Sequence, residues 1–169
     1  DDYYSTIAEW TDKNLSLKSV EYDGQNNVKS RYWVWRNGIC YKHFQLNRGT
    51  KIKTLDMDTF TNIIAEVNPD LILLVDYRNG LFDNHDFVQY LIDFAKINNK
   101  KVISSSQTSS HENRYHFFSN SHLICMNEHE AQSCLPSFAP QKEEMFKLAR
   151  MLNSNICVTL GQKGSALLM

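Results

Sequence analysis

From residue 56 onward, helix-like and strand-like segments alternate along the chain, and this alternation restricts the fold more than any other feature. Apolar residues spaced three and four apart predict helices over residues 56–67, 83–97, 127–134 and 140–152. Short apolar runs predict strands over residues 71–75, 122–126, 156–160 and 166–169, with another beginning at residue 102. Strand–helix repetition of this kind predicts an α/β fold with a doubly wound, mostly parallel sheet and right-handed crossovers.

At several predicted helix starts, individual residues indicate where the helix begins. Asp56 and Asp83 are placed to cap the helices that follow them, and Pro140 is placed to open another. The helix that follows Asp56 should turn an apolar face inward as far as Val67. The run at residues 71–75 is continuously apolar, which predicts a strand buried on both faces of the sheet.

The first part of the chain has a different character. Residues 1–16 carry helix signals, and residues 17–22 and 28–46 predict strands. Residues 28–46 alternate around Asn37-Gly38, a dipeptide that supplies the two positive φ angles of a type I′ hairpin turn. The resulting register would pair Trp35 with Cys40, Trp33 with Lys42, and Arg31 with Phe44. Both faces would be amphipathic, which suits a projecting flap.

Length and composition exclude several classes of protein. The chain of 169 residues is long enough for one domain with a hydrophobic core. Its formal net charge of −1 gives no electrostatic argument for binding nucleic acid or an anionic membrane. No apolar run approaches the roughly 20 residues that span a bilayer. The chain begins at Asp1 and not at Met, so we expect either that its native N-terminus is absent or that a segment was removed.

None of the four cysteines forms a Cys-x-x-Cys pair, and at least three of them fall within predicted strands or helices. We therefore expect buried free thiols in a reducing cytoplasm.

Polar residues follow three of the predicted strands. These strand ends are residues 76–80, 127–130 and 159–164. Ligands of open α/β sheets bind outside the carboxyl ends of the strands, so we expect the three segments to open on one common edge.

Each candidate also has a purely structural interpretation. Asn127 with Glu130 is a helix capping box that needs no metal. Residues 159–164 can be only a tight turn between strands, and Asp76 can simply cap the turn that ends its strand. Three cations of the hairpin can form a solvated face that covers tryptophans with aliphatic stems: Lys29, Arg31 and Lys42.

The order of these motifs resembles a known family. Asn-x-x-Glu at residues 127–130, a helix, and then Val-Thr-x-Gly-x-x-Gly at residues 158–164 resemble ribokinase-like, or PfkB-type, carbohydrate kinases. Asp-Tyr-x-x-Gly at residues 76–80 and the segment 106–110 resemble the heptose-phosphate kinase branch, the kinase domain of ADP-heptose synthase. The hairpin resembles the β-lid that folds over the sugar. The resemblance covers essentially the whole chain but only the middle of the family's fold.

The resemblance implies ATP-dependent transfer of a phosphoryl group to the hydroxyl of a sugar or sugar phosphate, with Mg²⁺. Asn127 and Glu130 would organise Mg²⁺ through its waters. Thr159, Gly161 and Gly164 would shape the loop where the nucleotide lies.

On the acceptor side, Lys29, Arg31 and Asp76 would contact the substrate. Two copies would pair through the lid in a cytoplasmic homodimer, with no nucleic-acid or membrane partner. Residues 17–46 would form the lid, and residues 1–16 and 47–169 a partial α/β domain.

The chain departs from the family's pattern in four places. The Gly-Ala-Gly-Asp segment with the catalytic base is expected after Met169, so no catalytic residue is predicted within this chain. The N-terminal glycine-rich sugar-binding segment is also missing. Ser105 stands where relatives often carry Asp, and Asn79 where heptose-phosphate kinases often carry Lys.

Two other hypotheses follow from these departures. The chain could be a non-catalytic relative that binds a nucleotide, a sugar phosphate or a partner chain. It could also be an unrelated Rossmann-like domain, although no Gly-x-Gly-x-x-Gly follows a predicted strand.

Overall fold

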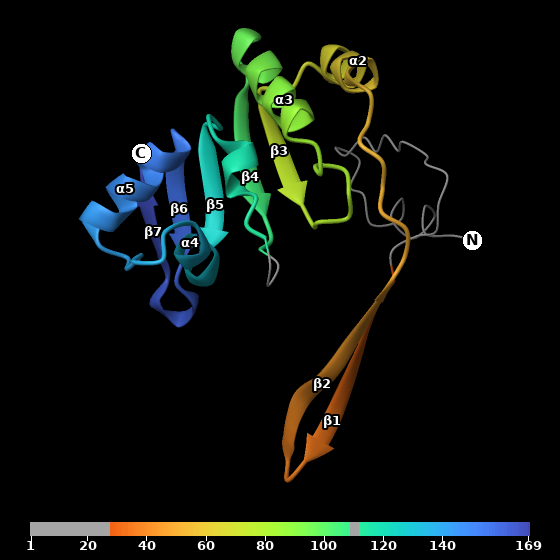
Figure 1. Cartoon of the computed structure of the whole chain (residues 1–169), viewed down its shortest axis with the longest axis vertical. Helices are drawn as coiled ribbons and strands as arrows, with labels where there is room; N and C mark the ends of the chain where they lie inside the picture. The colour runs from red at the N-terminus through yellow and green to blue at the C-terminus, as the bar shows by residue number, and fades with distance from the viewer. Residues whose placement is uncertain (1–27, 109–111) are drawn as a thin grey trace.

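A hairpin projects from an α/β body in the computed structural model, which describes residues 28–108 and 112–169 (Figure 1). The helices and strands are β1 (Val28–Arg36), β2 (Ile39–Arg48), α2 (Met57–Val67), β3 (Leu71–Asp76), α3 (His85–Ile97), β4 (Lys101–Ser106), β5 (Leu123–Asn127), α4 (Glu128–Cys134), α5 (Lys142–Leu152), β6 (Asn155–Thr159) and β7 (Ser165–Leu168). The helix predicted within residues 1–16 and the strand at residues 17–22 lie outside the described residues.

The body is built on a five-stranded sheet of order β3-β4-β5-β6-β7. The first four strands run parallel, and β7 pairs antiparallel with β6. Parallel strands need crossover connections, and α3, α4 and α5 lie in the connections between them. The predicted α/β class and mostly parallel sheet are therefore confirmed.

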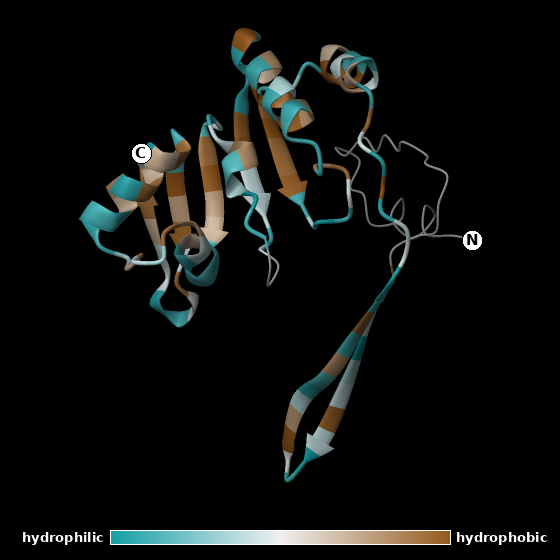
Figure 2. Cartoon of the chain, in the orientation of Figure 1, coloured by the Kyte–Doolittle hydropathy of each residue, from teal (hydrophilic) through white to brown (hydrophobic). Residues whose placement is uncertain are grey.

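One face of the sheet carries the hydrophobic core. Neighbouring strands place Ile72, Val102, Ile124 and Ile156 on this face, and all four are buried. The helices and the 3₁₀ turn at Tyr115–Phe118 pack against it and contribute further buried side chains, among them Phe87, Leu91, Tyr115, Phe118, Met145 and Leu148. In Figure 2 β3 and β6 are largely brown, because apolar residues make up most of both strands.

The opposite face of the sheet is uncovered in the part of the chain that the structure describes. The side chains of β3 alternate between buried and exposed, and Leu73 is 61% exposed. The prediction that residues 71–75 are buried on both faces is therefore wrong for these residues, because no described helix packs on the second face.

The cysteines were also predicted to be buried, and this is wrong. All four are free thiols, but Cys40 is exposed and the other three are only partly buried. Cys125 and Cys157 are register partners on the uncovered face, which explains their access to solvent.

Helix starts were predicted to within two residues. Asp56 caps α2, since its Oδ1 accepts a hydrogen bond from the Thr59 N–H at 2.7 Å. The cap of α3 is Asn84 and not Asp83, and α5 is capped at Gln141, one residue after Pro140. The predicted inward position of Val67 is wrong, because that side chain is exposed at the last turn of α2.

The hairpin turns at Asn37-Gly38 with φ angles of 53° and 77°, as a type I′ turn requires. A β-bulge shifts the register between Tyr32 and Trp33, so Tyr32 pairs and stacks with Phe44, their ring centroids 4.2 Å apart. The predicted pairs at Trp35 and Trp33 are confirmed, but that of Arg31 with Phe44 is wrong because the bulge shifts the register. Apolar and polar residues alternate along both strands (Figure 2).

The linker after the hairpin is tied to the loop that follows β3. The Ile52 N–H donates to the Asn79 carbonyl at 2.6 Å. Gly80 has a φ of +111°, and a Cβ on it would stand 2.2 Å from the Ile52 carbonyl oxygen. Only glycine fits this contact, so Gly80 secures the point where the hairpin joins the body.

Candidate functional site

The carboxyl ends of β3, β4, β5 and β6 enclose a pocket of about 300 Å³, called here the strand-end pocket. Its lining includes Asp76, Asn127, Glu130 and Thr159, which come from three separate strand ends and the first turn of α4. The three predicted segments therefore do open on one edge of the sheet. Their roles in binding stay predictions.

Asn127 and Glu130 form a complete capping box at the start of α4. Asn127 Oδ1 accepts from the Glu130 N–H at 2.8 Å, and Glu130 Oε2 accepts from the Asn127 N–H at 2.8 Å. The purely structural interpretation of this motif is thus present in the fold. It also fixes the Glu130 carboxylate at the pocket wall.

Tyr115 is a site residue that the sequence analysis missed. Its hydroxyl contacts Glu130 Oε2 at 2.8 Å and also donates to the Ser106 carbonyl. Burial, and then the Glu130 carboxylate, raise the pKa of Tyr115, so the phenol stays protonated and able to donate. No local motif marks this residue, because it reaches Glu130 across the core from a 3₁₀ turn.

The donor set at Glu130 is compatible with a hydrated Mg²⁺. Oε2 accepts the capping hydrogen bond from the Asn127 N–H and contacts the Tyr115 hydroxyl. Oε1 makes no hydrogen bond within residues 28–108 and 112–169. In those same residues, no three His, Cys, Asp or Glu side chains come together as metal ligands. A single carboxylate oxygen suits an ion that keeps most of its own waters, as Mg²⁺ does.

Asp76 is buried and fully engaged. Its Oδ2 accepts from the Ser106 hydroxyl at 2.8 Å, and its Oδ1 accepts from the Arg78 N–H at 2.7 Å. The second bond closes a turn that holds Arg78 at a φ of +62°. Asp76 therefore shapes the loop after β3, as its structural interpretation expected, and still lines the strand-end pocket.

The predicted nucleotide loop is a tight turn between β6 and β7. The Leu160 N–H donates to the Gly164 carbonyl at 2.8 Å, and Gly161 and Gly164 have positive φ angles. Among the residues that the structure describes, nothing lies within 4 Å of the position that a Cβ would take on either glycine. Thr159 lines the strand-end pocket, whereas the two glycines lie outside its wall with open space beside them.

A second pocket of about 470 Å³ lies where the hairpin meets the body, and we call it the junction pocket. Lys29 lines it, together with Arg48, Lys51 and Arg78, whereas the predicted substrate residue Arg31 does not.

Five charged side chains form a network of ion pairs where the linker meets the loops of the body. Arg114 donates through Nε and Nη2 to both carboxylate oxygens of Glu112, at 2.6 and 2.9 Å, and through Nη1 to Asp83. Glu112 also pairs with Arg78 at 2.8 Å, and Asp83 pairs with Lys51 at 2.8 Å. Three loops are thereby connected in one network.

The network shifts the titration of its carboxyl groups. Hydrogen bonds from Arg114 hold the pKa of Glu112 below its ordinary value. Burial raises the pKa of Asp83, but hydrogen bonds from Lys51 and Arg114 outweigh it, so the net shift is downward. Both carboxylates therefore stay ionised and paired at neutral pH.

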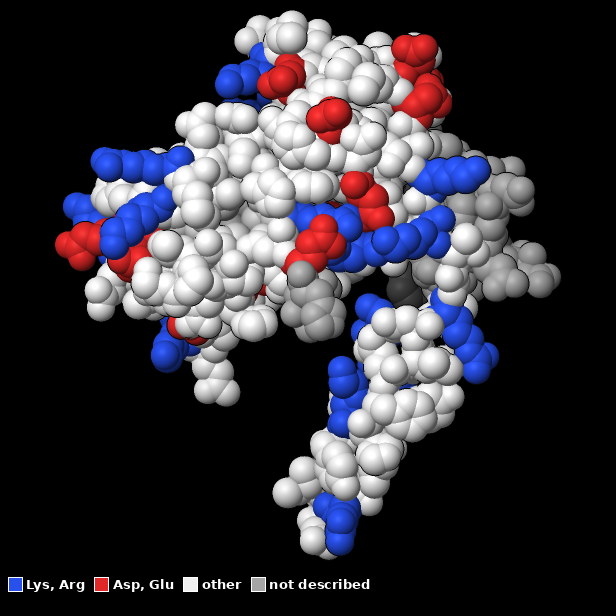
Figure 3. Space-filling model, in the orientation of Figure 1, with Lys and Arg blue, Asp and Glu red and all other residues white. Residues whose placement is uncertain are grey.

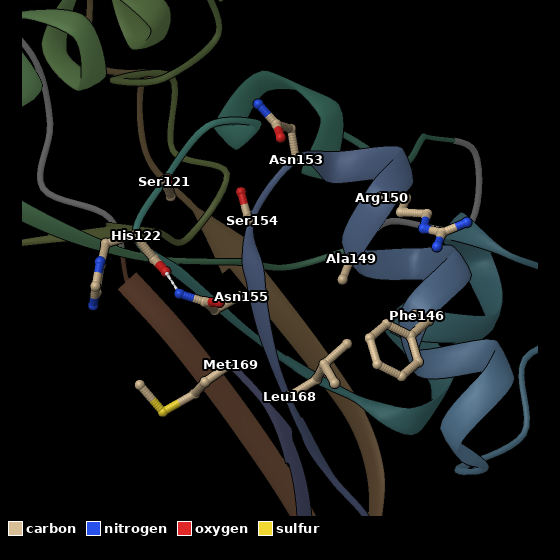
Figure 4. Close-up of a pocket in the computed structure, with 10 residues that line it drawn as sticks. All are labelled: Ser121, His122, Phe146, Ala149, Arg150, Asn153, Ser154, Asn155, Leu168 and Met169. Atoms are coloured by element: carbon tan, nitrogen blue, oxygen red, sulfur yellow. Dashed lines mark hydrogen bonds between the residues drawn. The ribbon is translucent and has the colours of Figure 1, made fainter.

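A third pocket, of about 390 Å³, lies at the opposite edge of the sheet (Figure 4). It is lined by residues at the amino ends of β5 and β6, by α5 and by the end of β7. Inside it, the Asn155 side chain donates to the His122 carbonyl at 2.7 Å. None of the predicted site residues reaches this edge, so it is not the candidate site.

No family model matches this sequence, and no curated protein matches it either. Solved structures do. Arabidopsis thaliana ribokinase, solved in complex with ribose and ATP, matches with a TM-score of 0.55 at 15% identity, over 79% of this chain and 42% of that one.

Two structures of Escherichia coli phosphofructokinase-2 match as well. The potassium complex has a TM-score of 0.50 at 15% identity, over 78% of this chain and 43% of that one. The complex with fructose-6-phosphate has a TM-score of 0.51 at 17% identity, over 83% of this chain and 47% of that one. The chain thus spans less than half the length of each.

These matches place the chain in the ribokinase-like fold class. The fold expected from the motifs is confirmed. At such identities the likeness shows the fold alone, since one fold hosts many functions. None of the helices in the described ranges has the length and apolar content to cross a membrane.

Proposed function

We propose that this chain is part of an ATP-dependent sugar kinase that transfers a phosphoryl group to a sugar hydroxyl. The observation that carries the proposal is the strand-end pocket, where Asp76, Asn127, Glu130 and Thr159 meet on one sheet edge. The ribokinase neighbour was solved with ribose and ATP, which supports the same ligand classes here.

ATP would lie along the edge from Asn127 to Thr159, with its phosphates toward the strand-end pocket. Mg²⁺, when bound, would neutralise charge on the phosphates, and the Glu130 carboxylate would hold it through water. Asn127 and Tyr115 keep that carboxylate in place by hydrogen bonds. The backbone beside Gly161 and Gly164, open where a side chain would stand, would pass close to the nucleotide.

The acceptor would be a sugar or a sugar phosphate, bound between the hairpin and the body. Lys29 and Arg31 on the hairpin would attract an anionic acceptor, and Asp76 would hold the adjoining loop. The residues that resemble the heptose-phosphate kinases support that branch.

Binding of MgATP measured by calorimetry tests the nucleotide part. We expect Glu130→Gln to weaken MgATP binding about tenfold, because a charge-assisted contact is lost. Glu128→Gln is the matched control, since Glu128 lies in the same first helical turn but outside the strand-end pocket. No MgATP binding to the unmodified chain, or equal losses for both variants, would contradict the proposal.

The capping box supports a second candidate, a ribokinase-like protein that binds ligand or partner without catalysis. In this fold the hydrogen bonds of Asp76 and Glu130 shape the local structure, and they form without any ligand. Tight sugar binding with no MgATP binding would favour this candidate.

The proposal extends to a homodimer through the hairpin. Eight large apolar side chains of β1 and β2 are exposed: Val28, Tyr32, Trp33, Trp35, Ile39, Tyr41, Phe44 and Leu46. A patch of this kind marks a binding surface in soluble proteins, and a second copy of the hairpin would cover it.

Light scattering coupled to gel filtration tests the dimer. We expect the unmodified chain to have twice the monomer mass and Trp33→Ser to shift it toward the monomer. Phe146→Ser, a matched control at an exposed aromatic residue of α5, should leave the mass unchanged.

We propose the cytoplasm as the compartment, because free thiols such as Cys40 persist where the environment is reducing.

A further inference from the structure

A continuous series of hydrogen bonds, called here the hydrogen-bond path, crosses the carboxyl edge of the sheet from the loop after β3 to the start of α4. It begins at the Arg78 N–H, which donates to Asp76 Oδ1 at 2.7 Å. Asp76 Oδ2 accepts from the Ser106 hydroxyl at 2.8 Å. The Tyr115 hydroxyl donates to the Ser106 carbonyl and contacts Glu130 Oε2 at 2.8 Å. The path therefore joins residues that are far apart in sequence.

The middle of the hydrogen-bond path is sealed from solvent. Asp76, Ser106 and Tyr115 are 4%, 3% and 1% exposed. Burial raises the pKa of Tyr115, so the phenol keeps its proton. A buried polar group that loses its partner is costly, and hydrogen bonds are stronger in a medium of low dielectric constant. A rearrangement at one of these groups therefore forces its neighbour in the path to respond.

Tyr115 is the branch point of the path. A phenol has one proton to donate, but this hydroxyl faces two acceptors, the Ser106 carbonyl and Glu130 Oε2. Two arrangements follow, one with the proton on the Ser106 side and one with it on the Glu130 side. Any cation that attracts the Glu130 carboxylate makes it a poorer acceptor and favours the Ser106 side. A two-state element of this kind is what energetic coupling between two sites requires.

The turn that carries Tyr115 is fixed against α4. The Tyr115 N–H donates to Asn113 Oδ1 at 2.9 Å. The Asn113 side chain in turn donates to Ser133 Oγ at 3.0 Å, in the last turn of α4. Glu130 contacts the hydroxyl from the first turn of the same helix. The hydroxyl is thereby held between its two acceptors while its proton changes partner.

The other end of the path reaches the junction of hairpin and body. The Arg78 side chain pairs with Glu112 at 2.8 Å. Figure 3 shows acidic and basic side chains gathered together where the hairpin meets the body. In the same loop, the Asn79 carbonyl accepts from the Ile52 N–H of the linker at 2.6 Å. The path thus connects a carboxylate of the strand-end pocket with the loop to which the hairpin is attached.

We propose that Tyr115 is a positioning residue that couples the Glu130 carboxylate to the loop after β3. A Mg²⁺–nucleotide held at Glu130 turns the phenol proton toward Ser106, which steadies Asp76 and the loop at Arg78. By linkage, ordering of that loop strengthens binding at Glu130 by the same factor. The ligand in this inference rests on the proposed function, whereas the coupling through Tyr115 can be measured without a ligand.

Backbone hydrogen exchange followed by nuclear magnetic resonance tests the coupling. We expect Tyr115→Phe to speed exchange of the Arg78 N–H about fivefold, the size expected from the loss of one hydrogen bond. The Thr59 N–H is the reference amide, because it too donates to an aspartate oxygen, Asp56 Oδ1, at 2.7 Å but lies outside the path. Its exchange should not change.

Tyr90→Phe is the matched control variant. It removes a phenol from a side chain of α3 that packs against the same core but takes no part in the path. Equal acceleration at Arg78 in both variants, or equal acceleration at Thr59 and Arg78 in Tyr115→Phe, would show a general loosening and overturn the inference.

Glu130→Gln tests the path without altering the core. An amide oxygen is a weaker acceptor than a carboxylate, so the phenol should turn to Ser106 and exchange of the Arg78 N–H should slow several-fold. In the Tyr115→Phe background the same substitution should leave Arg78 unchanged. No response of Arg78 to Glu130→Gln, or the same response without the phenol, would overturn the inference.

Addition of MgATP separates the coupling from the proposed function. MgATP should slow exchange at Arg78 several-fold in the unmodified chain, but not in Tyr115→Phe, and should leave Thr59 unchanged in both. A chain that binds MgATP with no response at Arg78 overturns the inference and leaves the proposed function standing. A chain that does not bind MgATP, but whose Arg78 responds to Glu130→Gln only through Tyr115, contradicts the proposed function and supports the coupling.

Discussion

In the body of the chain, α3, α4 and α5 enclose one face of the sheet, and the side chains between them are buried. In the hairpin, almost every side chain of β1 and β2 is exposed, and the two strands are held by their antiparallel backbone pairing and by cross-strand contacts such as Tyr32 with Phe44. An isolated two-stranded hairpin is marginally stable in water. The body therefore supplies the stability, while the hairpin carries exposed cations and apolar side chains.

The largest effect should come from emptying the core of the body. Phe118 is fully buried, and its ring lies 5.9 Å from that of Phe82. We expect Phe118→Ala to lower the free energy of unfolding by about 3–5 kcal/mol, because it removes apolar burial and leaves a cavity. Urea unfolding followed by circular dichroism measures it. A loss below about 1 kcal/mol would show that the core is placed wrongly.

The next effect should arise where hairpin and body meet. Gly80→Ala forces a Cβ against the Ile52 carbonyl at a positive φ. We expect a loss of about 3 kcal/mol in unfolding free energy, from backbone strain and displacement of the linker. Gly38→Ala is the control, because Gly38 also has a positive φ but no described residue lies within 4 Å of its Cβ position. Equal losses in the two variants would remove the close contact as the cause.

Acid should test the ion-pair network of the junction. Asp83 and Glu112 have lowered pKa values in the folded state, so their contribution to stability is full above their ordinary pKa and is lost as the pH falls through the lowered one. Arg114 is only 12% exposed and pairs with both.

We expect Arg114→Gln to lower the melting temperature at pH 7 and to flatten its fall between roughly pH 5 and pH 2. Melting followed by circular dichroism over that range measures both effects. Lys147→Gln, which breaks an exposed pair with Glu144 on α5, is the control with the smaller change. Parallel pH curves for the Arg114 variant and the unmodified chain would contradict the account.

The smallest effect should be found on the hairpin itself. Trp35 is 73% exposed. We expect Trp35→Ala to change the unfolding free energy by less than about 0.5 kcal/mol at protein concentrations where light scattering finds only monomer. A loss of several kcal/mol under those conditions would mean that the hairpin packs against the body, and the contrast between the two regions would fail.

The periodicity of apolar residues and the residues at helix and strand ends were enough to predict most of the body. Asp56 and Asn127 cap their helices, and the residues after β3, β5 and β6 lie on one edge, because both features depend on local spacing and on strand direction. The hairpin turn was predictable for the same reason, since Asn37-Gly38 satisfies its φ angles without help from the rest of the chain.

What escaped prediction depends on contacts between distant residues. The bulge at Tyr32 shifts the hairpin register, and no residue type marks it. The N-cap of α3 is Asn84 and not Asp83, and the Asp83 carboxylate pairs instead with the distant Lys51 and Arg114. Tyr115 and the junction pocket likewise join segments far apart in sequence.

The central claim is that the carboxyl edge of the sheet binds MgATP. Amide chemical shifts recorded while MgATP is added to the isotopically labelled chain test it most directly. We predict that the largest changes fall at Asn127, Glu130 and the turn from Thr159 to Gly164, with little change around Arg150 and Asn153 in the pocket of Figure 4. Changes that cluster in that opposite pocket, or no changes at all at millimolar MgATP, would contradict the account.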